Sequence, residues 1–236
     1  MERILSRRTT NTHRRGAIAA ATTSFWFLVT AAQAAQLPLH PDLHGVWVKG
    51  KEPAEGLESP PPLTPEGQKM FERDKAGIAA SDPEIDVGLR CIPTGFPRTA
   101  LNGLPVYITE DPMLVAVLGE ASQNIPQMIW MDTTHRDLWP TYMGDSVGHW
   151  EGDTLIVDTV SVKTTTFYNA AGFPHSDAFH VIERFKLMNG GKQLENRITF
   201  EDPKFLTKPW QVRMVYDHDD TQRPIENICD STRLAP

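Results

Sequence analysis

From residue 105 onward, short apolar runs alternate with turn-forming residues. Many of these runs switch between apolar and polar positions and are rich in β-branched and aromatic residues, as is typical of half-buried strands. The pattern predicts strands over 105–109, 113–118, 127–131, 146–150, 154–160, 179–187, 194–201 and 211–217, after a shorter strand around Val46. Short links such as Glu151-Gly152-Asp153 favour antiparallel neighbours, because a parallel pair needs a long crossover.

After the N-terminal 35 residues, only one helix is expected. Thr64 is placed to cap it, Pro65 suits its first position, and Glu66 lies near the positive end of the helix dipole. The helix is predicted over about 64–80. About nine strands and one N-terminal helix make the protein mostly β. Closing the sheet removes exposed edges, which favours an antiparallel up-and-down barrel of the lipocalin or calycin type. A two-sheet β-sandwich is the alternative.

Alternation along the later strands predicts which side chains face the interior. Glu183 and Asn196 share the inward faces with apolar residues, whereas the two faces of 154–160 are equally apolar and leave the direction of Asp158 open. The apolar residues expected inside are Val181, Phe185, Leu187, Leu194, Ile198, Phe200, Val212, Met214 and Tyr216.

The first 35 residues are predicted to be a secretory signal peptide. A basic segment precedes the uncharged apolar stretch 16–30, and Ala32-Gln33-Ala34 offers a cleavage site. Two arginine pairs fit a Tat signal, but neither is followed by the expected Phe, so Sec export is favoured. A retained anchor is the alternative, although the stretch is short for a membrane span. Residues 36–236 then form one periplasmic or secreted domain without a stable membrane span.

The net charge limits the classes of partner that the protein can bind, and the cysteine count bears on its cellular compartment. The formal net charge is −7, and removing five Arg and one Glu with residues 1–34 makes it about −11. An acidic chain without a basic cluster argues against nucleic acid or anionic membranes as partners. Two cysteines in an exported chain predict one disulfide between Cys91 and Cys229. Neither cysteine has a CxxC partner, so a metal site is disfavoured.

The segment 172–187 holds the densest group of proton-transfer side chains. We predict catalytic roles for His175, Asp177, His180 and Glu183. A strand would place Asp177 and Glu183 on its apolar face, where burial raises the pKa of a carboxyl group towards neutral pH. Asp177 could orient His175. His180 faces away from Glu183 unless a bulge brings the two together.

Each of these assignments has a structural alternative. Glu183 could form an ion pair with Arg98, and Asp177 could only make turn hydrogen bonds. A metal site of His175, Asp177 and His180, with His149 or His135, has acceptable ligands but matches no known spacing, so no metal is predicted. The long connections 132–145 and 161–178 are expected at the barrel mouth. Predicted substrate-binding residues are Arg98, Tyr142, Met143, His149, Tyr168, Asn169 and Asn196.

Four motifs together resemble a family of secreted, mostly uncharacterised bacterial proteins. They are Cys91-Ile92-Pro93-Thr94-Gly95-Phe96-Pro97-Arg98, the segment 148–159 (GHWEGDTLIVDT), the segment 174–185 (PHSDAFHVIERF), and Asp202-Pro203-Lys204 followed by Lys208-Pro209-Trp210. The resemblance spans about residues 42–232. It implies export and a single mostly-β domain, and it implies no particular activity.

These observations predict a periplasmic enzyme that acts on a small hydrophobic or aromatic molecule by acid–base chemistry. It would be a lyase, hydratase, isomerase or hydrolase without a cofactor, with Arg98, Tyr168 or Asn169 stabilising developing negative charge. The alternative is a non-catalytic, lipocalin-like protein that binds such a molecule. A third possibility is a structural protein whose interior is filled by side chains. The sequence does not define the substrate or the oligomeric state.

Overall fold

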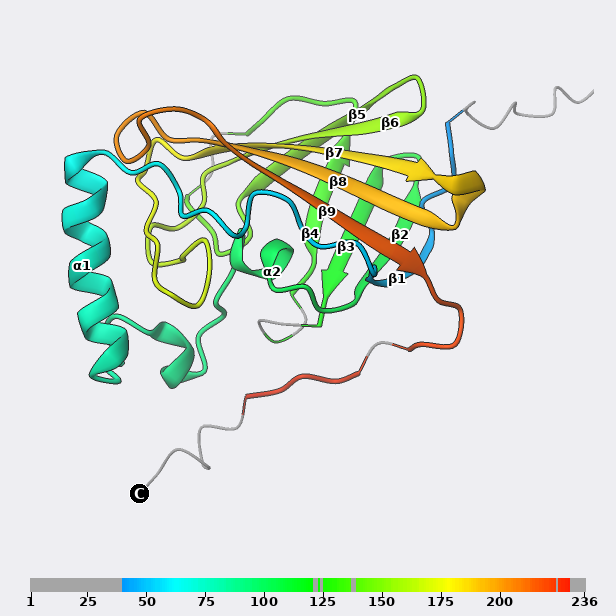
Figure 1. Cartoon of the computed structure of the whole chain (residues 1–236). Coiled ribbons are helices and arrows are strands. Elements are labelled where there is room, and N and C mark those ends of the chain that lie inside the picture. The colour runs from blue at the N-terminus through cyan, green and yellow to red at the C-terminus, as the bar shows by residue number, and fades with distance from the viewer. Residues whose placement is uncertain (1–39, 121–122, 124, 137–138, 224, 230–236) are drawn as a thin grey trace, which may run out of the picture. The chain divides into compact units, whose positions relative to one another are not determined.

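The computed structural model describes residues 40–229, except 121, 122, 124, 137, 138 and 224 (Figure 1). The expected signal peptide, residues 1–35, lies outside the described residues. None of the described helices is both long and apolar enough to cross a membrane.

The described residues form nine strands that close into one barrel, with each strand beside its neighbours in the sequence. This confirms the predicted barrel in place of the sandwich. The strands are β1 (Gly45–Lys49), β2 (Val106–Asp111), β3 (Leu114–Gly119), β4 (Gln127–Met131), β5 (Asp145–Glu151), β6 (Thr154–Val160), β7 (His180–Met188), β8 (Gln193–Glu201) and β9 (Trp210–His218).

One strand pair departs from the antiparallel prediction. β4 and β5 are parallel, with Trp130 opposite Val147, whereas every other neighbouring pair is antiparallel. The connection 132–144 is long enough to return the chain along the barrel before β5 begins, which a parallel pair requires. This connection was predicted as a mouth loop, and its effect on strand direction was missed.

The short strand β1 closes the barrel. Its first half pairs with β2, where Gly45 faces Ile108, and its second half pairs with β9, where Lys49 faces Tyr216. After β1, the chain pairs with β9 once more, through an isolated bridge between Glu55 and Arg213. The N-terminal segment therefore joins the two ends of the sheet and covers part of each edge, which limits the unpaired strand that could aggregate.

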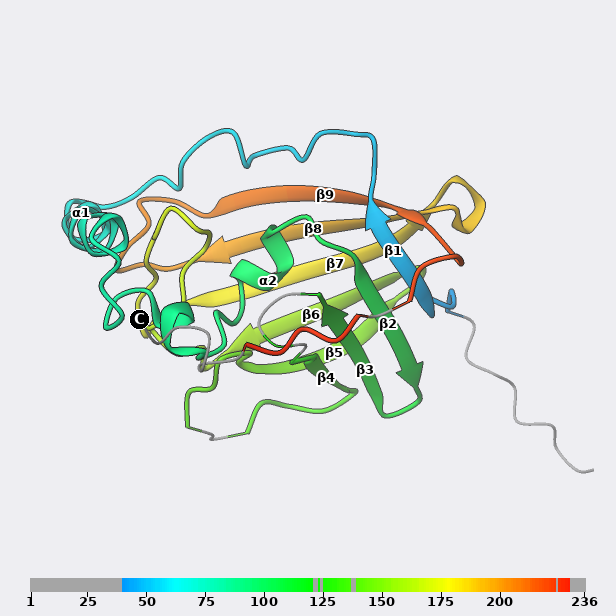
Figure 2. The ribbon, with the colours of Figure 1, turned by 90° about the horizontal axis from the view of Figure 1, so that it is seen from below.

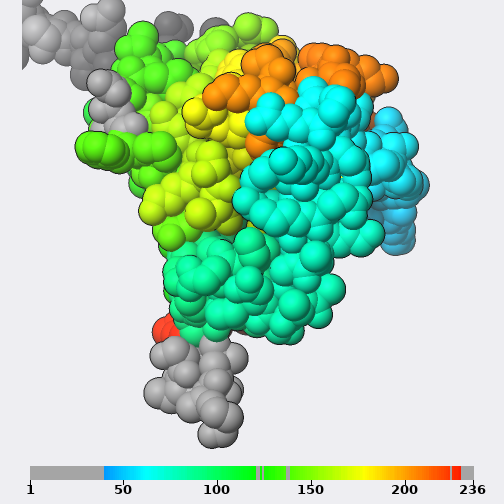
Figure 3. All heavy atoms as spheres, turned by 90° about the vertical axis from the view of Figure 1, so that its left-hand side faces the viewer, coloured from blue at the N-terminus to red at the C-terminus, as the bar shows by residue number. Residues whose placement is uncertain are grey.

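The predicted helix is present as α1 (Pro65–Ala79), and the Thr64 side chain accepts a hydrogen bond from Gly67 N at its start. Phe71 stacks on Phe173 with ring centroids 4.0 Å apart, which packs α1 against the β6–β7 connection. In the space-filling view, α1 and neighbouring loops cover this end of the molecule (Figure 3). The shorter helices are η1 (Val87–Arg90), α2 (Arg98–Leu101) and η3 (Asn189–Gly191), and none of them was predicted.

The barrel interior matches the predicted alternation. All nine apolar residues expected inside are buried or packed against the core. Asp158 faces outward, with 41% of its side chain exposed, which settles its direction. Asp177 does not share the inward face of β7, because its segment turns before the strand begins at His180 and leaves 73% of its side chain exposed.

The predicted disulfide joins Cys91 to Cys229 across 138 residues, with the two Cα atoms 5.3 Å apart. It fastens the segment after η1 to the chain that follows β9. Tyr107 on β2 donates a hydrogen bond to the carbonyl of Arg223 at 2.8 Å in the same C-terminal segment. The C-terminal segment is therefore held both to the segment after η1 and to β2.

Candidate functional site

The interior site is built around Glu183. Alternation along β7 points this side chain inward, where it is only 1% exposed. Its two carboxylate oxygens accept hydrogen bonds from Gln127 Nε2 on β4 and from Asn196 Nδ2 on β8, both at 2.8 Å. Glu183 and Asn196 come from adjacent strands, whereas Gln127 reaches across from another part of the wall. The barrel thus brings together three polar groups that are far apart in the sequence.

Two hydroxyl groups extend this network. Gln127 Nε2 lies 3.3 Å from both Ser146 Oγ and Thr159 Oγ1, which are 2.8 Å from each other. All five side chains are buried. Hydrogen bonds to buried polar groups replace the water that those groups lose on folding. The network therefore orients Gln127 towards Glu183 and fixes the carboxyl group in place.

The electrostatic environment favours the protonated form of Glu183. Burial raises the pKa of this carboxyl group, and the hydrogen bonds from Gln127 and Asn196 only partly oppose the rise. Both of its hydrogen-bond partners among the described residues are neutral amides, so Glu183 is not paired with Arg98. The pKa of Tyr216 is raised, mainly by burial and to a smaller extent by the nearby charge of Glu183.

A cavity of about 20 Å³ lies beside Glu183, which is enough space for about one water molecule. Thr99 and Ala100 of α2 form part of its wall, so α2 closes this side of the interior (Figure 2). Asn196 Oδ1 is buried and has no hydrogen-bond partner among the described residues. The cavity therefore contains a carboxyl group, an unused amide acceptor and apolar walls. Met143, Phe185, Val106 and Val117 provide apolar side chains for those walls.

His175 does not join this site. Its Nε2 lies 2.7 Å from Thr166 Oγ1, and its Nδ1 lies 3.1 Å from the carbonyl oxygen of Ser176. Burial lowers the pKa of His175 to about 4, so the ring is neutral at ordinary pH. Tyr168 packs beside it in an aromatic cluster with Phe179, Phe200 and Trp210. His175 and Tyr168 therefore lie in a packed cluster and not beside Glu183.

Asp177, His180 and Tyr142 line a separate groove of about 690 Å³ on the outer surface. Lys204 pairs with Asp177 there, so Asp177 does not orient His175 as predicted. His180 faces outward from a regular strand, and no bulge turns it towards Glu183. The four predicted catalytic residues thus occupy three places, because the chain turns between His175 and His180 and alternates after it.

The other predicted substrate-binding residues are dispersed. His149 is exposed and lies 3.2 Å from Glu151, Asn169 accepts a hydrogen bond from Ala171 N in a turn, and Arg98 begins α2. Only Met143 and Asn196 of that set line the cavity beside Glu183. Among the described residues, no group of three or more His, Cys, Asp or Glu side chains is arranged to hold a metal ion.

A chain of imidazoles and carboxylates on the outer surface was missed in the sequence. His135 and His180 both lie within hydrogen-bonding distance of Asp158 Oδ1, at 3.0 and 2.9 Å. The second ring nitrogen of His135 lies 3.0 Å from Asp145, and that of His180 lies 3.1 Å from Glu201. Burial alone would lower the pKa of His180, but its two carboxylate partners raise it. In the sequence, only an outward direction of Asp158 could have indicated this row of linked imidazole and carboxylate groups.

Comparison with known proteins identifies no family for the chain, since no family model and no curated protein matches it. Among solved structures, it is similar to a luciferase domain from the dinoflagellate Lingulodinium polyedrum, with 17% sequence identity and a TM-score of 0.32. The match covers 81% of this chain and 48% of that chain, so the protein spans about half the length of the luciferase domain. At this level, the likeness does not bear on function.

Proposed function

We propose that the barrel binds a small apolar molecule that carries a hydrogen-bond donor, with Glu183 as the acceptor. The observation that carries the proposal is a fully buried carboxyl group beside a cavity and without a cationic partner among the described residues. A carboxyl group without a cationic partner is costly in such a place, because burial disfavours its charged form, and we take this cost as a sign that the group has a role. A ligand amine or hydroxyl group would donate a further hydrogen bond to Glu183, and the apolar walls would contact the rest of the ligand.

Entry of this ligand requires α2 to move, because the present cavity holds about one water molecule. α2 is only four residues long, and Tyr216 Oη lies 3.4 Å from its Ala100 carbonyl, a long and therefore weak hydrogen bond. Moving Thr99 and Ala100 away from Glu183 enlarges the cavity without breaking a strand pair. We therefore place the ligand entrance at α2.

Acid–base catalysis is the second candidate. The raised pKa of Glu183 favours it, because a carboxyl group that titrates nearer neutral pH can donate or accept a proton during a reaction. His175 and Asp177 provide no second proton-transfer group beside it. Any such reaction would therefore depend on Glu183 and on a proton of the substrate or of one water molecule.

The binding proposal is tested with 1-aminoanthracene, a fluorescent probe that combines an apolar body with an amine. We expect saturable fluorescence enhancement, and we expect anthracene, which lacks the amine, to bind more weakly. E183Q should weaken binding of the amine about tenfold, because the amide that replaces the carboxyl group has one acceptor oxygen instead of two. The exposed substitution E151Q is the matched control and should leave affinity unchanged.

A second variant fills the cavity. A Cβ atom built on Gly119 lies 3.7 Å from the carbonyl of Thr99, which is ordinary van der Waals contact, so a larger side chain can grow into the space. G119L should abolish binding of 1-aminoanthracene, whereas G119A should retain most of it. Probe binding that neither E183Q nor G119L alters would place the ligand elsewhere and contradict the proposal.

Export to the periplasm is also part of the proposed function. The basic, apolar and small-residue segments of residues 1–34 support it, and so does the Cys91–Cys229 disulfide, which is typical of an oxidising compartment. Fractionation of producing cells, with sequencing of the N-terminus of the exported protein, tests both the compartment and the cleavage after Ala34.

A further inference from the structure

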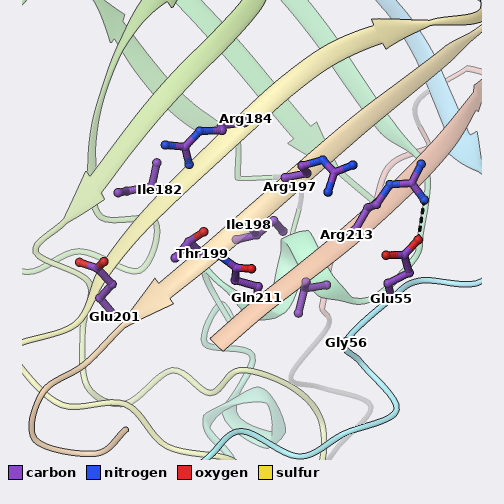
Figure 4. A pocket seen from close by; sticks show the side chains of 11 residues that line it. Glu55, Gly56, Ile182, Arg184, Arg197, Ile198, Thr199, Glu201, Gln211 and Arg213 are labelled. Atoms are coloured by element: carbon purple, nitrogen blue, oxygen red, sulfur yellow. Dashed lines mark hydrogen bonds and ion pairs between the residues drawn. The ribbon is translucent and has the colours of Figure 1, made fainter. Parts of the chain in front are cut away.

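Three arginines form a row across the outer face of the barrel (Figure 4). Arg184 on β7 is directly opposite Arg197 on β8, and Arg197 is directly opposite Arg213 on β9. Like charges that face each other across neighbouring strands destabilise a sheet unless opposite charges compensate for them. The row is therefore either neutralised by neighbouring carboxylates or arranged for a ligand.

Carboxylates neutralise one end of the row. Arg213 contacts Glu195, Glu52 and Glu55, and the last two distances are 3.2 and 3.0 Å. Glu195 also accepts hydrogen bonds from Nε and Nη2 of Arg197, at 2.7 and 3.1 Å. Arg213 is thus fully compensated, whereas Arg197 shares its single carboxylate with Arg213 and keeps Nη1 unused among the described residues.

The other end of the row is not neutralised. Arg184 is exposed and makes no ion pair or side-chain hydrogen bond among the described residues. Glu201 also lines the groove on the β7–β8 side, and it is already 3.1 Å from His180. The guanidinium groups of Arg184 and Arg197 point in opposite directions along the sheet (Figure 4), as expected for two like charges without an anion between them.

The surface beside the row is concave and polar. A groove of about 690 Å³ runs over the three strands, within the size range of small-molecule sites. One row further along, Ile182, Thr199 and Gln211 lie opposite one another and line the same groove. Thr199 and Gln211 add a hydroxyl and an amide within this surface, so a ligand here would meet both charged and neutral hydrogen-bonding groups.

We propose that this groove binds a small polar molecule through one carboxylate or phosphate group, towards which the exposed side chains of Arg184 and Arg197 turn from the directions they have in Figure 4. The planar guanidinium group matches both anions with two parallel hydrogen bonds, and an anion between the two arginines removes their mutual repulsion. Glu52, Glu55 and Glu195 already occupy Arg213, so the anionic group is expected on the β7–β8 side, where Arg184 has no such partner among the described residues. Thr199 and Gln211 then contact the hydroxyl groups of the ligand.

The test uses calorimetric titration at constant ionic strength with three probes: glucuronate, inorganic phosphate and glucose. We expect glucuronate to bind, phosphate to bind more weakly, and neutral glucose not to bind. R184Q and R197Q should each weaken glucuronate binding at least about tenfold, since each removes a charge-assisted contact. K186Q is the matched control, because Lys186 lies two residues from Arg184 on the same outer face and pairs with Asp153 outside the groove.

Two results would overturn the proposal. One is a failure of both glucuronate and phosphate to bind the folded wild-type protein. The other is an equal loss of affinity in R184Q and K186Q, which would show general attraction to positive charge. Sedimentation with phosphatidylglycerol vesicles separates the sources of phosphate: binding to vesicles that R184Q abolishes, without binding of the soluble probes, would contradict a small-molecule site. E183Q should leave glucuronate affinity unchanged, so this test is independent of the interior site.

Discussion

At the scale of single residues, Glu183 and Arg184 show how one bond of the backbone separates two environments. Alternation along β7 puts Glu183 among neutral amides inside the barrel and puts Arg184 on the outer face. Among the described residues, the inner carboxyl group is desolvated and has no cationic partner, while the outer guanidinium group is solvated and has no anionic partner. The two proposed sites therefore lie on opposite faces of the same strand and can be altered separately.

We predict that E183Q stabilises the protein above about pH 5. The folded-state pKa of Glu183 is raised from its ordinary value of 4.5. The contribution of this side chain to the free energy of unfolding is therefore fully favourable below pH 4.5, and it is lost as pH rises through the folded-state pKa. Glutamine cannot ionise, and it retains most of the shape and hydrogen-bonding capacity of the side chain. The expected gain at pH 8 is about 1–3 kcal/mol, measured by urea unfolding at several pH values.

The pH dependence identifies the cause of this gain. The difference between E183Q and the wild type should shrink towards pH 4, whereas E151Q should show no such trend. A loss of stability in E183Q that is the same at every pH would contradict the prediction and would mean that the hydrogen bonds outweigh the buried charge. A stabilised E183Q that no longer binds 1-aminoanthracene would show that this carboxyl group is kept for function at a cost in stability.

At this scale, the sequence is informative only within regular strands. The burial of Glu183 and Asn196 follows from alternation, because both lie inside strands whose inner faces are otherwise apolar. His175 and Asp177 were misplaced because alternation was extended over a segment that turns, with Ser176 Oγ accepting a hydrogen bond from Ala178 N. Gln127 was missed as a partner of Glu183, because their contact crosses 56 residues and depends on the curvature of the barrel.

At the scale of elements, too, the sequence is informative only where a regular pattern or a capping motif is present. The ends of the strands predicted from residue 105 onward agree with the observed ends within one or two residues. α1 was predicted from its cap and its proline. α2 has four residues and no hydrogen-bonding cap, so it leaves no pattern in the sequence. The parallel β4–β5 pair was also missed, since the direction of β5 depends on the path of 132–144. α2 matters most for function because it forms part of the wall beside Glu183.

The imidazole–carboxylate chain fastens elements to one another, and we predict that it weakens at alkaline pH. Asp145, His135, Asp158, His180 and Glu201 link β5, the connection after β4, β6, β7 and β8, and Arg136 adds a contact to Asp145 at 3.5 Å. Both ring nitrogens of His180 face carboxylates, so both can donate hydrogen bonds only when the ring is protonated.

For His180, the folded-state pKa is raised above 6.5. Its contribution is therefore complete below pH 6.5 and is lost as pH rises through the folded-state pKa. H180Q should cost about 0.5–1 kcal/mol at pH 6 and almost nothing at pH 9, a small effect because solvent screens these partly exposed pairs. Thermal unfolding across this range measures it, and H149Q, at an exposed histidine on β5, is the control. An equal cost of H180Q at both pH values would mean that the ring acts only through packing.

At the scale of the whole molecule, closure depends on two contacts between distant parts of the chain. β1 joins β2 to β9 by strand pairing, and the Cys91–Cys229 disulfide joins the segment before the barrel's second strand to the segment after its last. The disulfide was predicted from the compartment and from the even cysteine count. The role of β1 in closing the sheet was not predicted, because a strand of five residues gives no sign of pairing with two neighbours.

We predict that removing the disulfide lowers stability substantially while leaving the barrel folded. The bond closes a loop of 138 residues, and the loss of chain entropy in the unfolded state corresponds to about 4–5 kcal/mol as an upper estimate. The double variant C91S/C229S should therefore unfold at a temperature lower by roughly 10 °C, since a domain of this size shifts by a few degrees per kcal/mol. Its far-ultraviolet circular dichroism should remain that of the wild type, because no strand contains either cysteine.

Reduction of the wild-type protein provides the matched comparison. A reducing agent should bring the wild type to the unfolding temperature of C91S/C229S and should have no effect on the double variant. Binding of 1-aminoanthracene should persist in both, because neither cysteine lines the cavity beside Glu183. If the double variant lost its β-sheet signal, the disulfide would be a requirement for closing the barrel, and strand pairing through β1 would not be sufficient to hold the ends of the sheet together.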